Sequence, residues 1–237
     1  MNSVAFVDHL LRNHDQVITD IQDESKSRFI TSTCIKVFLC LSAFYGLIMG
    51  SQNLVHGGID GWKYTLAAGI KLPMLFLFTL AICLPLFYVL NVSIGPRTRF
   101  QTVLGLLMSS IAVTSIVLIS CAPIVLFFML STKSYPFIIL LNVIVFTGAG
   151  GYGVRFLGKG MHSLMPEAEI KVEPEQAKQG VSTIMQFWLV TYGLVGTQMA
   201  WIMRPFIGSP KPFSFFRALE SNFYLDLFHV IRQLMGL

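Results

Sequence analysis

The sequence predicts an all-α membrane protein: a polytopic bundle of about five transmembrane helices, with an amphipathic helix at each end of the chain. Two observations lead to this prediction. Hydrophobic residues make up 54% of the 237 residues and charged residues only 12%, whereas an ordinary globular domain has roughly 25% charged residues. Between Ser25 and Pro166 the only acidic residue is Asp60. So few charges cannot cover a water-facing surface, and most of this stretch must therefore face lipid.

Residues 1–28 predict an amphipathic helix on the cytoplasmic side rather than a membrane span. On a helical wheel the apolar residues, such as Leu10 and Ile18, share one face, and acidic residues such as Asp8 and Asp15 lie opposite. An acidic polar face does not favour adhesion to anionic lipid. We expect this helix to dock either on the cytoplasmic surface of the protein itself or on a partner.

The central part of the chain, residues 29–203, predicts the transmembrane bundle. A helix needs about 20 apolar residues to cross the hydrocarbon core of a membrane. Five segments meet this requirement: 29–50, 64–92, 101–131, 135–157 and 181–203. The second and third are longer than a perpendicular crossing requires and contain Pro73, Pro85 and Pro123, which predicts tilted or kinked helices. The alternative is that one of these two segments is broken or partly re-entrant.

Two polar regions accompany the spans. Residues 159–180 form the only long polar loop. Two prolines close together in residues 208–212 end the fifth span. After them, residues 204–237 place apolar side chains on one helical face and polar side chains on the other. This C-terminal tail is too polar on one side to span, so we expect it to lie in the membrane interface or to pack on another subunit.

Basic residues near the ends of the spans predict the orientation, because cytoplasmic loops carry an excess of Lys and Arg. With the N-terminus inside, the cytoplasmic side receives Arg12, Lys26, Arg28, Arg97, Arg99, Arg155, Lys159, Lys171 and Lys178. The opposite loops then contain only Lys63 and Lys133, although the basic residues of the tail also fall on that side. We expect a multi-pass protein of the cell inner membrane with a cytoplasmic N-terminus.

Polar residues inside the spans are the first candidates for function. Lys36 and Lys71 each lie seven residues into a segment, about 10 Å along a helix, which is within reach of the interface. The predicted spans contain no Asp, Glu or His, and this argues against proton- or sodium-coupled transport. Four amide side chains predict hydrogen bonds between helices or, alternatively, the lining of a pore: Asn91, Asn142, Gln186 and Gln198.

Small residues predict where helices pack closely. Residues 148–153 match the G-x-G-x-x-G pattern of dinucleotide sites, but the pattern requires a strand before it and a helix after it. Inside a span, Gly148 and Gly150 instead predict close helix approach or local unwinding. In the fifth span, small residues four positions apart predict a tight helix–helix contact within or between chains: Gly193 with Thr197, and Gly196 with Ala200.

The sequence predicts neither an enzyme nor a cofactor site. All four cysteines lie singly in apolar segments, and metal sites or disulfide frameworks need paired spacings. We find no arrangement of nucleophile and base, and no clustered carboxylates or histidines of the kind that a lipid-modifying enzyme needs. The basic residues stand singly or in pairs at the ends of spans, which excludes nucleic acid as the expected partner and leaves membrane lipid.

Two motifs resemble a bacterial family of uncharacterised multi-span membrane proteins. They are Lys71-Leu-Pro-Met-Leu-Phe with the following Cys83-Leu-Pro-Leu-Phe-Tyr, and Trp201-Ile-Met-Arg-Pro-Phe-Ile-Gly-Ser-Pro. The resemblance covers roughly residues 60 to 225 and implies the same architecture, without any catalytic residue. Five spans with a cytoplasmic N-terminus are also similar in topology to the Yip family of GTPase-interacting membrane proteins, from which the long amphipathic tail departs.

These observations favour a non-enzymatic membrane subunit or scaffold that assembles with partner proteins or with itself. Amphipathic segments at both ends and a small-residue face on the last span support this hypothesis, since hydrophobic faces outside the bilayer need to be covered. The alternative is a small channel or permease, with a path between the kinked second, third and fourth spans. That path would be lined by Asn91, Asn142, Ser109, Ser110, Ser115 and Ser120.

Overall fold

A computed structural model of the chain describes residues 3–51, 61–94, 99–132, 134–163 and 174–203, together with residue 232. Within these ranges it contains seven helices and no strand, so the predicted all-α class is confirmed. The helices are α1 (Ser3–Arg12), α2 (His14–Gln22), α3 (Glu24–Gly50), α5 (Gly61–Ile94), α6 (Phe100–Ser131), α7 (Tyr135–Ser163) and α8 (Pro174–Met203). The predicted amphipathic tail, residues 204–237, lies outside the described residues apart from residue 232.

Four of the described helices are long and apolar enough to cross a membrane. They are Ser25–Gly50 in α3, Gly61–Val89 in α5, Phe100–Ser131 in α6 and Pro136–Ser163 in α7. They coincide with the first four predicted spans, and the chain is therefore a polytopic membrane protein. Helix α8 contains the predicted fifth span but is not one of the four, because Gln186, Gln198 and several small polar residues lower its hydropathy.

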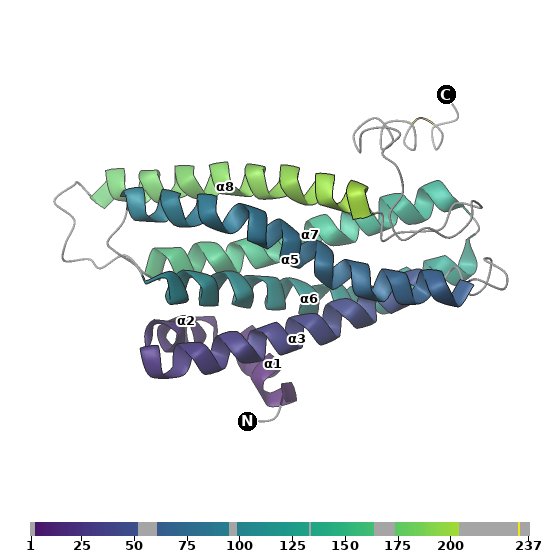
Figure 1. The fold of residues 1–237 in the computed structure, drawn as a ribbon, viewed down its shortest axis with the longest axis horizontal. Coiled ribbons are helices and arrows are strands. Elements are labelled where there is room, and N and C mark those ends of the chain that lie inside the picture. The colour runs from purple at the N-terminus through teal and green to yellow at the C-terminus, as the bar shows by residue number, and fades with distance from the viewer. Residues whose placement is uncertain are drawn as a thin grey trace.

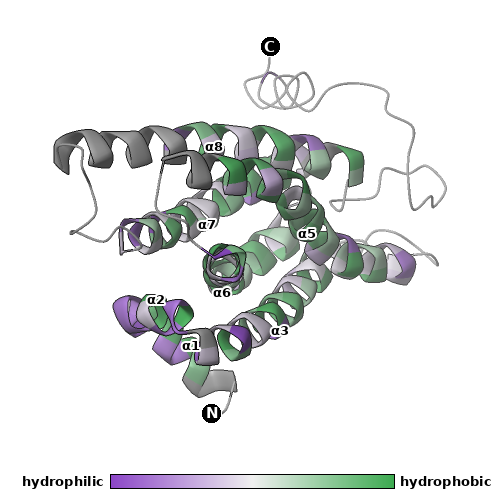
Figure 2. Ribbon diagram, turned by 60° about the vertical axis from the view of Figure 1, so that its left-hand side comes forward, coloured by the Kyte–Doolittle hydropathy of each residue, from purple (hydrophilic) through white to green (hydrophobic). Residues whose placement is uncertain are grey.

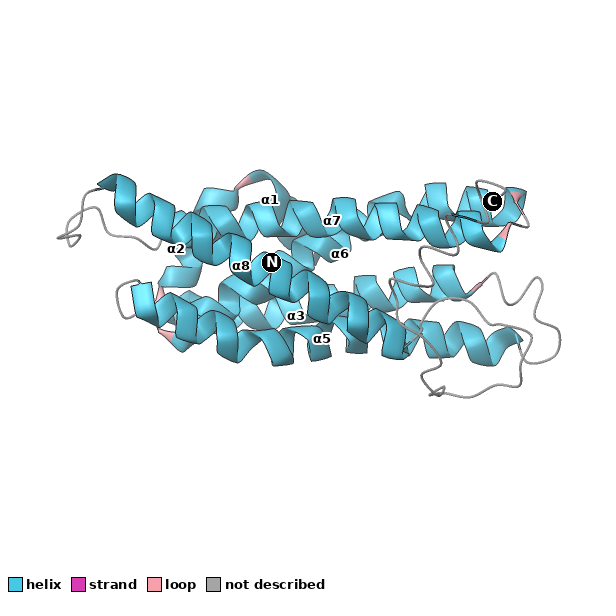
Figure 3. Cartoon of the chain, turned by 90° about the horizontal axis from the view of Figure 1, so that it is seen from above, coloured by secondary structure: helices cyan, strands magenta, loops and turns pink. Residues whose placement is uncertain are grey.

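The long helices lie side by side in a bundle, with α8 along one edge and α3 toward the opposite edge in the view of Figure 1, and Figure 3 shows the same bundle from above. Helix α3 packs along both α5 and α6. Helix α7 packs on α6, and α8 packs on α5. The order of neighbours is therefore α8, α5, α3, α6, α7. Helices α8 and α7, the first and last in this order, contact each other only slightly.

The proline-containing helices are continuous. Helix α5 runs through Pro73 and Pro85, and α6 runs through Pro123, so neither is broken or re-entrant. The 34 residues of α5 extend about 51 Å at 1.5 Å per residue, well beyond the ~30 Å hydrocarbon core. Such a helix must tilt or project from the membrane. Part of the predicted polar loop is also helical, since α7 continues to Ser163 and α8 begins at Pro174.

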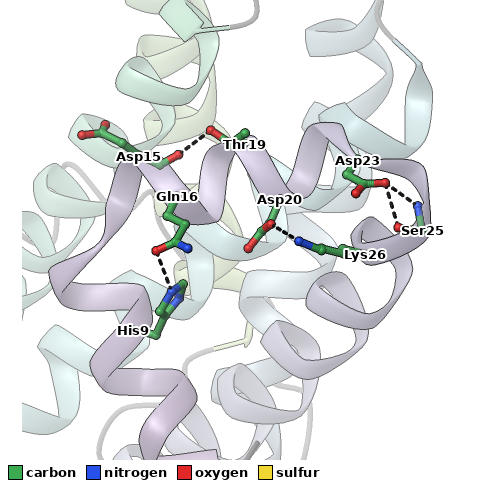
Figure 4. Close-up of polar contacts among 8 residues, drawn as sticks. All are labelled: His9, Asp15, Gln16, Thr19, Asp20, Asp23, Ser25 and Lys26. Carbon is green, nitrogen blue, oxygen red and sulfur yellow. Dashed lines mark hydrogen bonds and ion pairs between the residues drawn. The ribbon is translucent and has the colours of Figure 1, made fainter.

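Residues 3–28 form two short helices and the first turn of α3, where the sequence predicted a single helix over residues 1–28. The helix is interrupted at Asn13 and again at Asp23, where the backbone is not helical. Asp23 caps α3, because its carboxylate accepts hydrogen bonds from the Ser25 hydroxyl (2.8 Å) and the Ser25 N–H (3.0 Å) (Figure 4). These bonds favour the charged carboxylate and lower the pKa of Asp23. As a result α3 begins at Glu24, before the predicted start of the first span.

The apolar face of α1 and α2 docks on the protein's own bundle. The sequence had left open whether it docks there or on a partner. Helix α2 packs on α3, α6 and α7. His14 lies edge-on to Phe156 of α7, with ring centroids 5.3 Å apart. Gln22 donates a hydrogen bond from Nε2 to the Ser163 carbonyl oxygen at the end of α7 (3.2 Å). The buried apolar side chains are Phe6, Leu10, Val17, Ile18 and Ile21.

The outer surface of the bundle is apolar along the long helices. Figure 2 shows hydrophobic residues over most of the long helices and hydrophilic residues concentrated in α1 and α2. Large apolar side chains are exposed on every long helix, among them Phe44, Ile82, Phe127, Ile144 and Val190. Such a surface fits surrounding lipid, because lipid tails are as apolar as these side chains.

Candidate functional site at the buried polar interface

Three of the membrane helices bury a group of polar side chains, which we call the polar interface. It consists of Cys34, Ser42 and Tyr45 of α3, Ser109, Ser110, Thr114 and Ser115 of α6, and Asn142 of α7. Polar groups in the membrane need hydrogen-bond partners within the protein or water in a cavity. The hydrogen-bond partners of each side chain therefore indicate whether it joins two helices or lines a pore.

Asn142, a predicted pore or contact residue, connects α7 to α3. The Tyr45 hydroxyl donates a hydrogen bond to Asn142 Oδ1 (3.2 Å), and Asn142 Nδ2 donates to the Ile138 carbonyl oxygen (2.9 Å). Both side chains are buried. The Tyr45 ring also packs edge-on against Phe146, with centroids 5.7 Å apart. Both ends of the amide are thus engaged within the bundle, and Asn142 acts as a helix–helix contact.

The hydroxyl groups of α6 are likewise bonded to helix atoms. Ser109 Oγ lies 3.3 Å from Cys34 Sγ on α3. Ser110 donates to the Gly153 carbonyl oxygen on α7 (2.7 Å). These bonds join α6 to both neighbours. Two further hydroxyls donate back to carbonyls of α6 itself, Thr114 to Ser110 and Ser115 to Ile111.

Those residues named for a possible channel that the structure describes do not gather on one path. Ser109, Ser110 and Ser115 are buried and bonded, whereas Ser120 is exposed on α6 and donates to the Ile116 carbonyl oxygen. The side chain of Asn91, in the last turn of α5, lies outside the part of the chain that the structure describes. The described geometry of this set is that of helix packing.

Gly153, the last glycine of the run 148–153, allows α7 to approach α6. A Cβ atom on Gly153 would collide with Thr114 Oγ1 and would lie 2.9 Å from the Ser110 carbonyl oxygen. Gly148 and Gly150, the predicted close-approach residues, have no atom of a neighbouring helix within 4 Å of such a Cβ. All three belong to the glycine-rich run in which the sequence predicted close helix approach, and within this chain that approach occurs at Gly153.

The contact of α3 with α5 also depends on small residues that the sequence analysis missed. A Cβ on Gly46 would lie 2.6 Å from the Ala68 carbonyl oxygen, and one on Gly50 would lie 2.7 Å from Thr65 Cα. Thr65 donates a hydrogen bond to the Gly50 carbonyl oxygen (2.9 Å). Gly46 and Gly50 form a G-x-x-x-G pair, a known pattern for close helix approach, so this signal was present in the sequence.

The small residues of α8 point in different directions. A Cβ on Gly196 would lie 3.6 Å from Thr79 Cγ2 of α5, an ordinary contact, whereas one on Gly193 would meet nothing within 4 Å. Gln186 is exposed, and Gln198, Thr197 and Ala200 are half-buried. Helix α8 is held on α5 instead by Trp188, whose ring centroid lies 4.8 Å from that of Phe87 on α5. Within α8, the Trp188 ring also stacks on Tyr192, with centroids 5.0 Å apart.

The two lysines within spans have different surroundings. Lys36 is exposed on α3, while Lys71 of α5 is only 7% exposed. The contacts of Trp188 with Phe87 and of Gly196 with Thr79 are equally spaced along both helices, so α8 and α5 run antiparallel in register. The same register places Lys71 level with the C-terminal end of α8. A cation there is favoured by the partial negative charge of a helix C-terminus.

Metal-ligating side chains do not cluster in the part of the chain that the structure describes. Within these ranges no group of three or more His, Cys, Asp or Glu could hold a metal ion. The four cysteines are free thiols, two of them buried. The two described ion pairs, Arg12–Asp8 and Lys26–Asp20, lie in the N-terminal region, away from the polar interface.

No protein family, curated protein or solved structure matches the chain. The resemblances to a bacterial family and to the Yip family therefore receive no support from these comparisons. What the findings establish is a polytopic helical membrane protein whose interior polar groups join its own helices.

Proposed function

We propose that this chain is a non-enzymatic membrane subunit or scaffold of the inner membrane, which assembles with partner proteins or with copies of itself through α7 and α8. One observation carries the proposal. Glycines near the middle of these two helices, Gly148 and Gly193, face away from the helices of their own chain. They lie on α7 and α8, each of which packs extensively on only one other long helix.

Glycine on such a surface is informative because lipid and protein use it differently. A lipid tail packs equally well on leucine, whereas a neighbouring helix gains close backbone approach from a small residue. Gly148 and Gly193 also weaken their own helices, since Gly costs about 1 kcal/mol relative to Ala in a helix. An approaching helix from another chain would offset this cost.

Two findings refine the hypothesis drawn from the sequence. The apolar face of α1 and α2 is buried on the bundle, so these helices need no partner to cover them. Among the described groups considered for a channel path, Ser109, Ser110, Ser115, Ser120 and Asn142 are bonded within the protein, and this supports a packed structural role over a conducting one.

The experiment compares assemblies purified in a mild detergent. We expect the wild-type protein to elute as a particle larger than one chain in light scattering or native mass spectrometry. Leucine at both positions, Gly148→Leu with Gly193→Leu, should shift it to a single chain. The control is Ile124→Phe, which adds bulk to an exposed site on α6. A wild-type protein that is strictly a single chain, or glycine variants that assemble normally, would contradict the proposal.

We also propose that α8 is a fifth span and that the N-terminus is cytoplasmic. No charged residue lies between Lys178 and Arg204, a length sufficient for a crossing. Helix α8 runs in register beside α5, itself a candidate span. Gln22 of α2 is bonded to Ser163 at the end of α7, and Ile21 of α2 lies beside Gly105 near the start of α6. The end of the bundle that carries α2 (Figure 1) is therefore the end at which α6 begins and α7 ends, and Arg99, Arg155 and Lys159 lie near these helix ends, as expected for a cytoplasmic face.

Reporter fusions test this topology. A reporter that is active only in the cytoplasm should work when it is fused after Ser163 and fail when it is fused after Met203. Activity at both sites would show that α8 does not cross the membrane, and the opposite pattern would reverse the orientation.

A further inference from the structure

The outward face of α3 carries two cations with a hydroxyl between them. Arg28, Ser32 and Lys36 are spaced four residues apart, which places them on one side of a helix, and all three are exposed. The opposite side of α3 packs on α5 and α6. This stripe therefore lies on the surface that the bundle presents to its surroundings.

These three groups differ from their neighbours in having no partner within the described part of the chain. Lys26 pairs with Asp20 (2.8 Å), and Arg12 pairs with Asp8 (2.7 Å), whereas among the described residues Arg28 and Lys36 form no ion pair. Thr31 and Thr33 each donate their hydroxyl to a backbone carbonyl of α3. Ser32, between them, makes no such bond in these ranges.

The position of α2 indicates the depth of the stripe in the membrane. A Cβ on Gly105 would lie 3.0 Å from Ile21 of α2 and 3.1 Å from Thr31 of α3, so the charged helix α2 lies level with the first turns of α3. Arg28 is then at the level of lipid headgroups. Lys36 is five residues beyond Thr31, about 8 Å deeper at 1.5 Å per residue, and its aliphatic chain can extend back toward that level.

Below the cations, the same helix exposes apolar side chains. Leu39 and Phe44 are exposed toward the middle of α3, and Phe29 is exposed beside Arg28. A phosphate group near Arg28 and Lys36 would therefore continue into a surface suited to an acyl chain.

We propose that this stripe binds an anionic phospholipid, with its phosphate contacting Arg28, Ser32 and Lys36 and an acyl chain lying along Leu39 and Phe44. Two cations at one phosphate favour a lipid with net negative charge over a zwitterionic lipid. Each Lys or Arg near an anionic membrane surface contributes enough to change binding about fivefold. Loss of both cations should therefore reduce the preference for anionic lipid by about 25-fold.

Native mass spectrometry of the full-length protein tests the site. The protein is released from nanodiscs that contain phosphatidylglycerol and phosphatidylcholine with identical acyl chains, and the lipids retained are counted. We expect the wild-type protein to retain phosphatidylglycerol preferentially. Arg28→Gln and Lys36→Gln should each weaken this preference about fivefold, and the double variant should nearly abolish it.

The control is the double variant Lys26→Gln with Lys159→Gln, which removes the same charge from the same end of the bundle. Lys26 already has a carboxylate partner, and Lys159 lies on α7. This control should keep the preference for phosphatidylglycerol. Thermal unfolding in phosphatidylcholine alone checks that each variant is folded, and Lys36→Arg should restore binding. Equal retention of both lipids by the wild-type protein, or an equal loss in the control, would overturn the proposal.

Discussion

Gly153 of α7 lies where α7 comes close to the backbone of α6. Ser110 donates a hydrogen bond to the Gly153 carbonyl oxygen, and a Cβ on Gly153 would collide with Thr114. From the sequence, the glycines of this run are equivalent, because periodicity does not say which side of a helix meets a neighbour. Only the direction of α6 distinguishes Gly153 from Gly148.

Replacement of this glycine should destabilise the bundle. We expect Gly153→Ala to lower the free energy of unfolding by about 1–3 kcal/mol, the usual cost of overpacking a tight contact. Gly151→Ala on the same helix is the control, because a Cβ there has no neighbouring atom within 4 Å, and it should be neutral or slightly stabilising. Unfolding in mixed detergent and denaturant measures both. Equal losses for the two variants would show that the approach of α6 is not the cause.

The hydrogen bond between Tyr45 and Asn142 should contribute to stability as a coupled pair. We expect a double-mutant cycle of Tyr45→Phe and Asn142→Leu to give a coupling free energy of about 0.6 kcal/mol, with an upper limit near 1.7 kcal/mol. The single Asn142→Leu variant should cost more than Tyr45→Phe, because it removes the bond to Ile138 as well as the bond to Tyr45. A coupling energy of zero would mean that the two groups do not depend on each other.

Helices were more predictable than single contacts, because their signal is spread over many residues. The first four spans emerge from long apolar runs, and the structure places helices there. Boundaries were less predictable. The break at Asn13 and the cap at Asp23 depend on local backbone geometry and on the docking of α2 against α7, which an apolar periodicity does not encode. The sequence also could not say whether the apolar face of residues 1–28 would meet the protein or a partner.

The docking of α2 should depend on its buried apolar residues. We expect Ile18→Ala to cost about 2–5 kcal/mol of local stability and to release α1 and α2 from the bundle, because Ile18 is almost fully buried. Limited proteolysis near Asn13 should then be faster than in the wild-type protein. The neighbouring Thr19→Ala changes an exposed residue and should leave the cleavage rate unchanged. Equal protection of the Ile18→Ala variant would show that other contacts hold α2.

At the scale of the whole molecule, the arrangement of the helices was not predictable from their individual patterns. Helix α6 packs mainly on α3 and α7 and only slightly on α5, although α5 is the helix that precedes it in the chain. The residues that set these contacts, such as Gly46 and Gly50 on α3, are small and provide little hydropathy signal. The consequence for stability is that α8 depends mainly on α5, whereas each of the other long helices packs extensively on α3 or α6.

We therefore expect α8 to separate from the bundle before the other long helices unfold. Trp188 is the residue to change, because it is buried between Phe87 and Tyr192. Trp188→Ala should cost about 3–5 kcal/mol at this contact, and Trp188→Phe should cost less, since it keeps a ring against Phe87. The Trp188 indole N–H has no hydrogen-bond partner among the described residues. Replacing Trp188 by Phe therefore breaks no hydrogen bond within these residues.

Hydrogen exchange with mass spectrometry can follow this separation helix by helix. In Trp188→Ala, exchange should rise in α8 and in the part of α5 around Thr79 and Phe87, while α3 and α6 keep the protection of the wild-type protein. Leu194→Ala, on the exposed face of α8, is the matched control and should leave exchange unchanged. If exchange rose equally in α3 and α6, the five long helices would form one cooperative unit. The light contact between α7 and α8 would then be stabilising the bundle far more than its extent indicates.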